Sequence, residues 1–397
     1  MTRIRLVAPI AVLAALAVAL SGCAPAVHQG AGGTATQGTS SQGSSHHTAK
    51  PIKKPVLKQV SQPKSQYAFG CNDLASAAQI APIFTDKMAP ANPATWDRTT
   101  GDGQLSELYF VEDLGGVTCR WDDSVSTPNG YESLYMTVMP ATAAGWARFL
   151  ASGIGPGVAG HTFTSCNGTQ DGGQNGCEFD DYINGTWLYA DFLDMVPSPA
   201  ASGATLPAPL QNLLHADVTK ITSGPSAMAA TPAVPAVAMP NDGTKLVTAA
   251  QLGTAFATAA PMTVNCALDD AGPWGTYVEA QFEETGAQGC NLGDNEGNEY
   301  AVLNWMVGGA WAAKQAEAAT PNEAPLAVPG LPAGDSAVTY VDPTGQTIRM
   351  DLILGGNWVS VWMLNTQDPG GGEPALSVTP LAALSSLASD IETTVRS

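Results

Sequence analysis

The stretch Leu74-Ala75-Ser76-Ala77-Ala78-Gln79-Ile80 occurs a second time, as Leu246-Val247-Thr248-Ala249-Ala250-Gln251-Leu252, about 171 residues further along the chain. In both stretches a hydroxyl residue is followed three positions later by Gln, which is the capping-box pattern that begins a helix. Cys119 and Cys290 match at nearly the same spacing. A repeat of this length indicates a duplicated domain whose copies have diverged.

Both copies share one order of predicted elements after the opening helix. Alternating or β-rich runs follow it in the first copy, at 107–111, 117–121 and 131–139, and in the second at 277–283 and 300–307. A short helix with Trp146 or Trp311 comes next, then a three-strand meander and a closing helix with one apolar face. The order predicts two tandem α+β domains, each an antiparallel sheet flanked by helices.

The chain begins with a predicted lipoprotein signal peptide at residues 1–22. Arg3 and Arg5 precede about 15 apolar residues, which end in Leu20-Ser21-Gly22-Cys23. This is the layout of a secretory signal, and the run is short for a membrane span. The four residues that end this run resemble the bacterial lipobox, so we expect an exported protein held by acylated Cys23 at the outer face of the cytoplasmic membrane. The alternative is an ordinary signal peptide with an incidental Cys.

Composition divides the remaining chain into four parts. Residues 23–66 are rich in Gly, Ser, Thr, Gln and Pro, with five lysines and no acid, and predict a disordered basic tether. The first α+β domain is expected at 67–222 and the second at 244–397. An Ala/Pro-rich linker at 223–243 joins them.

The two domains are predicted to be strongly acidic. All 35 acidic residues lie at or after Asp73, whereas seven of the 16 basic residues belong to the signal peptide and the tether. Nine basic residues therefore face 35 acidic ones, a formal charge of −26 for the folded part. A surface of this sign repels polyanions, which excludes DNA and RNA as partners.

Six cysteines follow Cys23, and an even number in an exported protein predicts disulfides. No Cys-x-x-Cys pair occurs, which disfavours a metal site. One pair of cysteines flanks a polar loop at a hairpin, which the second copy replaces with a short turn. The other two pairs join the shared strand position to a Cys near the opening helix of each copy. The expected disulfides are Cys166–Cys177, Cys71–Cys119 and Cys266–Cys290.

Cys71-Asn72-Asp73-Leu74 at a helix start and Cys119-Arg120-Trp121 on a strand resemble a large family of actinobacterial envelope lipoproteins built on a domain of unknown function. The second copy departs from this pattern, because Cys290-Asn291-Leu292 lacks the Trp and Asp242 stands where the first Cys is expected. The resemblance implies an α+β module tethered to the envelope and supplies no catalytic residues.

The sequence contains no recognisable catalytic constellation. Only two of the five histidines, His161 and His215, lie in the predicted domains. A nucleophile elbow, a His-Glu-x-x-His zinc helix and a phosphate-binding loop are all missing from the sequence. We therefore predict that the protein is not an enzyme and needs no cofactor. Asp294, Glu296 and Glu299 form a calcium candidate without the spacing of a hand-type loop, and a solvated acidic turn is the alternative.

The leading hypothesis is a non-enzymatic binding or interaction module of the cell envelope, with an envelope protein or a wall polymer as partner. The first alternative is a carrier or sensor of a lipid or glycolipid with an apolar pocket between sheet and helix, and the second is an envelope hydrolase. A cavity of several hundred Å³ favours the carrier. Two carboxylates that converge in a cleft favour the hydrolase. The nine tryptophans and Tyr189 could line a groove, but most fall on predicted core faces.

Overall fold

The computed structural model describes thirteen stretches of the chain, and all of them lie within one compact unit, Val56–Ser397. The described residues are 61–91, 107–123, 132–151, 162–167, 175–196, 205–227, 235–240, 242–258, 260–266, 288–319, 323–342, 345–365 and 376–397. The predicted signal peptide, Cys23 and the tether as far as residue 60 lie outside them.

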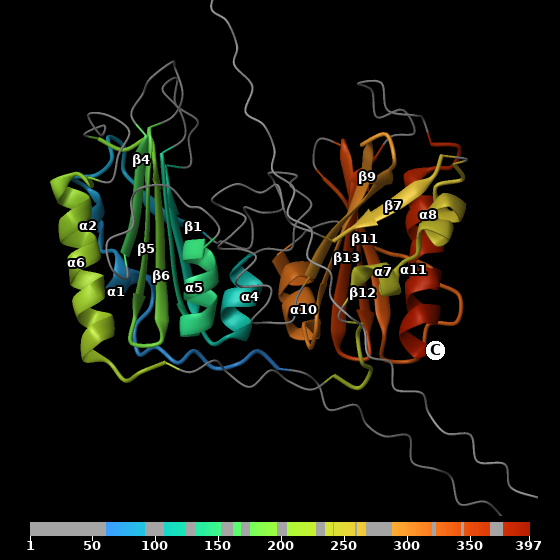
Figure 1. Cartoon of the computed structure of the whole chain (residues 1–397), viewed down its shortest axis with the longest axis horizontal. Helices are drawn as coiled ribbons and strands as arrows, with labels where there is room; N and C mark the ends of the chain where they lie inside the picture. Colours follow the sequence, from blue (N-terminus) through green and yellow to red (C-terminus); the bar gives the residue numbers. More distant parts are fainter. Residues whose placement is uncertain are drawn as a thin grey trace, which may run out of the picture. The chain divides into compact units, whose positions relative to one another are not determined.

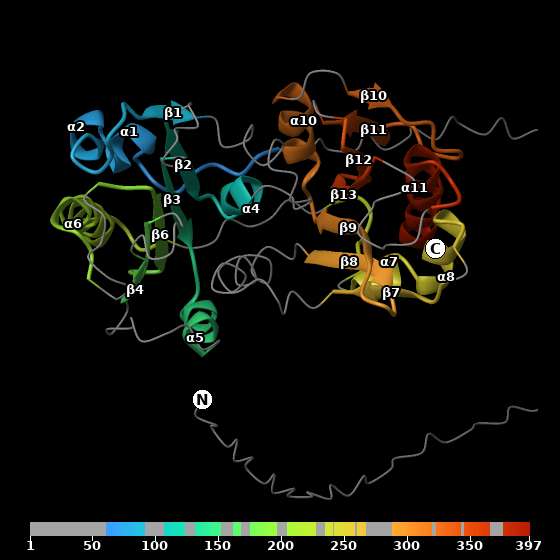
Figure 2. The ribbon, with the colours of Figure 1, turned by 90° about the horizontal axis from the view of Figure 1, so that it is seen from above.

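The first copy is built on a six-stranded antiparallel sheet with the strand order β1-β2-β3-β6-β5-β4 (Figure 1). Its strands are β1 (Ala89–Ala91), β2 (Val117–Asp122), β3 (Ser133–Pro140), β4 (Thr162–Asn167), β5 (Gly176–Ile183) and β6 (Thr186–Leu193). One face is covered by α1 (Cys71–Leu74), α2 (Ala77–Ile80) and α6 (Ala208–Ser223), and the opposite face by α4 (Glu107–Asp113) and α5 (Ala143–Ala151) (Figure 2).

The second copy repeats this plan with seven strands, in the order β10-β11-β12-β13-β9-β8-β7. These are β7 (Met262–Asn265), β8 (Gln288–Asp294), β9 (Glu299–Met306), β10 (Ala324–Pro325), β11 (Ser336–Val341), β12 (Thr347–Leu354) and β13 (Asn357–Leu364). Its helices are α7 (Gly243–Leu246), α8 (Ala249–Ala255) and α11 (Pro380–Arg396) on one face and α10 (Ala310–Ala319) on the other. Six strands keep the order of the first sheet and β10 extends the edge beside β11, which confirms two tandem α+β copies.

The repeated stretch forms its capping box in both copies. The Ser76 amide donates to Gln79 Oε1 at 3.0 Å, and the Thr248 amide donates to Gln251 Oε1 at 2.8 Å. The helix that each box begins is short, and a single-turn helix, α1 or α7, precedes it. Pro82 follows the end of α2, where it cannot donate the next helical hydrogen bond.

The expected strand at 107–111 is wrong, because the structure forms helix α4 there. Phe110 and Leu114 are both buried and four residues apart, so they lie on one face of a helix. A short apolar run does not distinguish the two periodicities, and packing against the sheet decides between them. The strand expected at 277–283 lies outside the described residues, so it stays a prediction.

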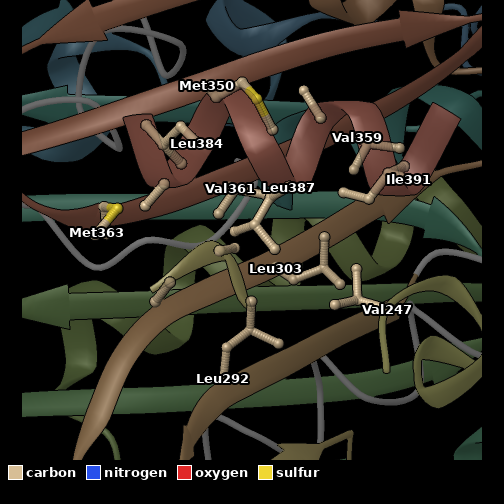
Figure 3. Close-up of a cluster of buried hydrophobic side chains, with 14 of the residues drawn as sticks. Val247, Leu292, Leu303, Met350, Val359, Val361, Met363, Leu384, Leu387 and Ile391 are labelled. Carbon is tan, nitrogen blue, oxygen red and sulfur yellow. The ribbon is translucent and has the colours of Figure 1, made fainter. Parts of the chain in front are cut away.

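The cores between the sheets and their long closing helices are filled with apolar side chains. In the second copy, Leu384, Leu387 and Ile391 of α11 belong to one buried cluster with Leu303 and Val361 of the sheet (Figure 3). The corresponding cluster of the first copy contains buried side chains of α6 that pack on β3, β5 and β6.

Three disulfides join the cysteines in the pairs expected from the sequence, Cys71–Cys119, Cys166–Cys177 and Cys266–Cys290. The bounds of α1 and α7 place Gly243, rather than Asp242, at the position of Cys71. A Cβ atom added at Gly243 would lie 2.2 Å from Cys290 Sγ. The space beside Gly243 is therefore occupied by the sulfur of Cys290 from β8, and a side chain at position 243 would collide with it. The cysteine on the strand, Cys119 or Cys290, thus occupies the same place in both copies. Its partner differs: it is Cys71 in α1 of the first copy and Cys266, directly after β7, in the second.

Candidate functional site

A groove of about 430 Å³ lies on the first copy, between the segment that precedes α1 and the segment that follows α6. The N-terminal wall is formed by residues 66–69, and the C-terminal wall by residues 224–227. Thr186 at the start of β6, together with Lys220 and Ile221 at the end of α6, lies between the two walls. The volume is within the usual range for small-molecule sites.

The C-terminal wall is fastened to the hairpin between β5 and β6. Ser226 Oγ donates to the carbonyl oxygen of Asn184 at 3.0 Å, and Asn184 Nδ2 donates to the carbonyl oxygen of Gly224 at 3.3 Å. Gly185 has φ +77°, and a Cβ atom there would lie 2.7 Å from the carbonyl oxygen of Ala227. The tight turn therefore requires glycine both for its backbone and for the close approach of this wall.

The N-terminal wall carries two aromatic rings that pack against the core of the first copy. The ring centroids of Tyr67 and Phe69 lie 5.2 Å apart. Tyr67 Oη donates to Thr186 Oγ1 at 3.2 Å, which ties this wall to β6. Burial raises the pKa of the Tyr67 phenol well above its usual value, so the group stays a neutral hydrogen-bond donor.

Lys220 places a positive charge at the edge of the groove. Its Nζ lies 5.7 Å from the centroid of the Phe69 ring, within the range of a cation–π contact. The same ammonium donates to the carbonyl oxygen of Asp73 and lies 3.3 Å from Asp217 Oδ1. The side chain is about one-third exposed, which leaves the charge accessible from the groove.

Asp217 is an anomaly in the apolar face of α6. The buried positions of α6 repeat those of α11 with Asp217 in the place of Leu387. The Asp217 side chain is fully buried, and its Oδ2 has no hydrogen-bond partner among the described residues. Burial raises the pKa of this carboxyl to about 7, although Lys220 acts in the opposite direction.

A second polar group lies on the face of the first sheet that α4 and α5 cover. Trp187 Nε1 donates to Asp180 Oδ1 at 2.7 Å, and Glu178 lies two residues away on the same face of β5. Asp191 pairs with Glu178 across the strands. Burial raises the pKa of Asp180, and the nearby Glu178 raises it further. Burial also raises the pKa of Glu178, to about 7.

The second copy keeps the Trp–Asp contact and changes its neighbour. Trp358 Nε1 donates to Asp351 Oδ1 at 2.9 Å. Arg349, at the position of Glu178, lies 2.8 Å from Asp351 Oδ2. A carboxyl pair in one copy thus corresponds to an ion pair in the other.

The acidic loop proposed from the sequence as a calcium candidate forms a hydrogen-bonded turn. Asp294 accepts hydrogen bonds from the amides of Glu296 and Asn298, from Asn298 Nδ2 and from Tyr300 Oη, at 2.8 to 3.1 Å. The Asn298 side chain contributes most to lowering the Asp294 pKa. Glu296 and Glu299 are exposed, and the structure does not bring ligand atoms of the three acids within 4.8 Å of one another.

Another acidic group comes closer to the geometry of a metal site. One ligand atom each from Asp86, Asp123 and Glu132 lies within 4.8 Å of the other two. The Glu132 carboxylate already accepts hydrogen bonds from the amides of Thr85 and Asp86, at 3.0 and 2.9 Å. These bonds account for the orientation of Glu132 without a cation.

The remaining candidates from the sequence contribute no site in the described part of the chain. His215 is exposed on α6, and His161 lies outside the described residues. The aromatic residues among the candidates that are buried in the cores are Trp121, Trp146, Trp187, Tyr189, Trp305, Trp311 and Trp358. The groove was not predicted from the sequence. The one sequence feature that could have pointed to it is Asp217, which interrupts the apolar face of α6.

Comparisons with protein-family models, with curated proteins and with solved structures each give no match. Among the helices that the structure describes, none has both the length and the apolar character needed to cross a membrane.

Proposed function

We propose that the protein is an exported, lipid-anchored envelope lipoprotein that binds a small ligand in the groove of its first copy and performs no chemistry on it. The observation that carries this proposal is the groove between the Tyr67–Phe69 wall and the end of α6, with its two aromatic rings and the ammonium of Lys220. The membership of the actinobacterial lipoprotein family suggested by the sequence is part of the same proposal.

The export of the protein is supported by its covalent chemistry and its charge. Leu20-Ser21-Gly22-Cys23 has the form of a lipobox, and three disulfides are typical of an oxidising compartment. The acidic domains would be repelled by anionic lipid headgroups, whereas the basic tether would be attracted to them. This arrangement suits a protein that presents its domains away from the bilayer.

The size of the groove favours a small ligand over a broad protein surface as the occupant. The pocket between sheet and closing helix that the carrier hypothesis required is filled by apolar side chains in the described part of both copies. A carrier of this kind would therefore use the groove beside α6 instead. We therefore favour a small ligand over an envelope protein or a wall polymer as the partner.

The hydrolase hypothesis requires two carboxylates that converge in a cleft. Glu178 and Asp180 have raised pKa values, as the residues of a catalytic dyad often do, but both are buried and neither lines the groove. In addition, the hydrogen bond from Trp187 to Asp180 recurs in the second copy between Trp358 and Asp351. A contact present in both copies supports a role in sheet packing, so we favour binding over hydrolysis.

Native mass spectrometry of the full-length protein, purified from its own envelope, tests the proposal. Ala68 is exposed and lines the groove, so Ala68→Trp should fill it and remove a bound small molecule. Ala78→Trp, on the exposed face of α2, is the matched control and should retain the ligand. If wild type and both variants carry the same adduct, or if none carries any, the groove is not the binding site.

A further inference from the structure

Building on the proposed binding function, we infer that the groove takes an amphiphilic monoanion: an apolar chain or ring against the Tyr67–Phe69 wall, with one carboxylate or phosphate group at Lys220. The source of the ligand can be a membrane lipid or a soluble acid, because both present the same chemistry to the groove.

The charge of Lys220 is available to such a ligand. An ammonium group has three donors, and among the described residues two are directed to the Asp73 carbonyl oxygen and to Asp217 Oδ1. The carboxylate of Asp73 accepts a hydrogen bond from the Gly70 amide at 3.0 Å, and so serves the first turn of α1. Lys220 is the one cationic side chain among the described residues that line the groove, and it retains a donor for an anion.

Asp217 holds the ammonium without cancelling its charge. The buried carboxyl has a pKa of about 7, so it is only partly ionised at neutral pH. The fold does not require an acid here, because α11 carries Leu387 at this position and Asp390 at the position of Lys220. The charge pattern at the end of α6 is therefore specific to the first copy and gives it a positive site on an otherwise acidic chain.

The walls supply the apolar part of the recognition. Tyr67 and Phe69 are partly buried against the core, and Ile221 and Pro225 also line the groove. The hydroxyls of Tyr67 and Thr186 bond to each other, which reduces the polar character of the surface between the walls. An apolar chain can occupy this surface without leaving those hydroxyls unpaired.

The test uses probes that share one chain and differ in head-group charge. The full-length protein is transferred from detergent micelles into the gas phase with dodecanoate, dodecyl phosphate, dodecanol or dodecyltrimethylammonium, and adduct occupancy is measured. We expect a 1:1 adduct with both anions and about tenfold weaker binding of the neutral and cationic probes, as for the loss of one charge-assisted hydrogen bond. Inorganic phosphate, which lacks the chain, should not give a stable adduct.

Lys220→Gln should abolish the preference for the anions, whereas Lys245→Gln, at an exposed lysine of α7, should preserve it. Because Lys220→Gln leaves Asp217 without its cation, the double variant Asp217→Leu/Lys220→Gln is examined as well and should behave in the same way.

The outcomes separate this inference from the proposed function. Equal binding of anionic and neutral probes to the wild type, or an unchanged preference in both Lys220 variants, overturns the monoanion assignment. If Ala68→Trp still prevents binding in that case, the groove remains the binding site with another ligand class. If Ala68→Trp binds every probe as the wild type does, both proposals fail together.

Discussion

Asp217 shows how one buried side chain distinguishes the two copies. The matching residue of α11, Leu387, packs in the core and buries no polar group there (Figure 3). In α6 a carboxyl oxygen without a partner among the described residues is buried at the same position, which destabilises the folded state. Its contact with Lys220 gives the acid a role that packing alone does not.

Replacing this acid should stabilise the protein while altering the groove. We expect Asp217→Leu to raise the free energy of unfolding by about 1–3 kcal/mol at pH 7, because a buried polar group is exchanged for apolar packing. Guanidinium unfolding of the full chain measures the change. Val218→Leu, at the half-buried neighbouring position, should have little effect. A lower stability of Asp217→Leu would contradict the equivalence with Leu387.

The Glu178–Asp180 pair should make stability depend on pH. The folded state raises the pKa of Glu178 from 4.5 to about 7, so it binds this proton more tightly than the unfolded chain does. The resulting stability is complete below about pH 4.5 and is lost as the pH rises through 7. Glu178→Gln should therefore reduce the decline in unfolding free energy between pH 5 and 8, and should exceed the wild type in stability at pH 8.

Glu296→Gln, at an exposed turn residue, provides the control for this pH series and should leave the decline unchanged. Part of the decline should persist in Glu178→Gln, because burial also raises the pKa of Asp180 and of Asp217. Identical slopes for the wild type and Glu178→Gln would show that Glu178 does not hold its proton in the folded state.

At the scale of elements, the three-strand meander before the closing helix of each copy could be predicted from the sequence, and the structure forms it as β4–β6 and β11–β13. Both β6 and β13 are nearly continuous apolar runs that are buried over most of their length. Asn184-Gly185 and Gly355-Gly356 mark their turns with positive φ angles. The edge strands β1 and β10 were missed because they are very short and contain Pro90 and Pro325, which weaken a strand pattern.

The candidate site was much harder to predict than the strands. Its walls are irregular segments at 66–69 and 224–227, separated by most of the first copy and brought together by hydrogen bonds to one hairpin. Loop segments of this kind carry no periodicity, so neither their proximity nor the groove follows from local pattern. Only the acid in the apolar face of α6 could have pointed to it.

The exchange of disulfide partner between the copies can be tested by restoring the first-copy arrangement in the second. In the variant Gly243→Cys/Cys266→Ser, we expect a bridge between position 243 and Cys290, because the two positions are in contact. Peptide mapping without reduction identifies the bridge. Cys266→Ser alone should lower the free energy of unfolding by about 2–4 kcal/mol. A free Cys290 thiol in the double variant would contradict the equivalence of Gly243 and Cys71.

At the scale of the whole molecule, one fold carries two different sets of polar side chains. The strand order and the Trp–Asp contact are common to both copies, whereas Lys220 and Glu178 of the first correspond to Asp390 and Arg349 of the second. Differences at these positions leave the architecture intact, so the two copies can serve separate purposes.

The anchor is tested on the intact protein. We expect Cys23→Ala to abolish metabolic labelling with a fatty acid and to release the protein from the membrane fraction, since a multiply acylated Cys is a stable anchor. Ser21→Ala, which leaves the cysteine in place, is the control. Continued acyl labelling of Cys23→Ala would disprove the assignment of the lipid attachment site.

The bond between Cys71 and Cys119 also bears on when the protein can bind. It fastens α1 to β2 directly after the wall that carries Tyr67 and Phe69. In a reducing compartment the two thiols would stay apart, and noncovalent contacts alone would hold that wall. For an exported chain, this covalent support would form only after translocation and oxidation. The bond would thus stabilise the wall in the compartment where the proposed ligand is bound.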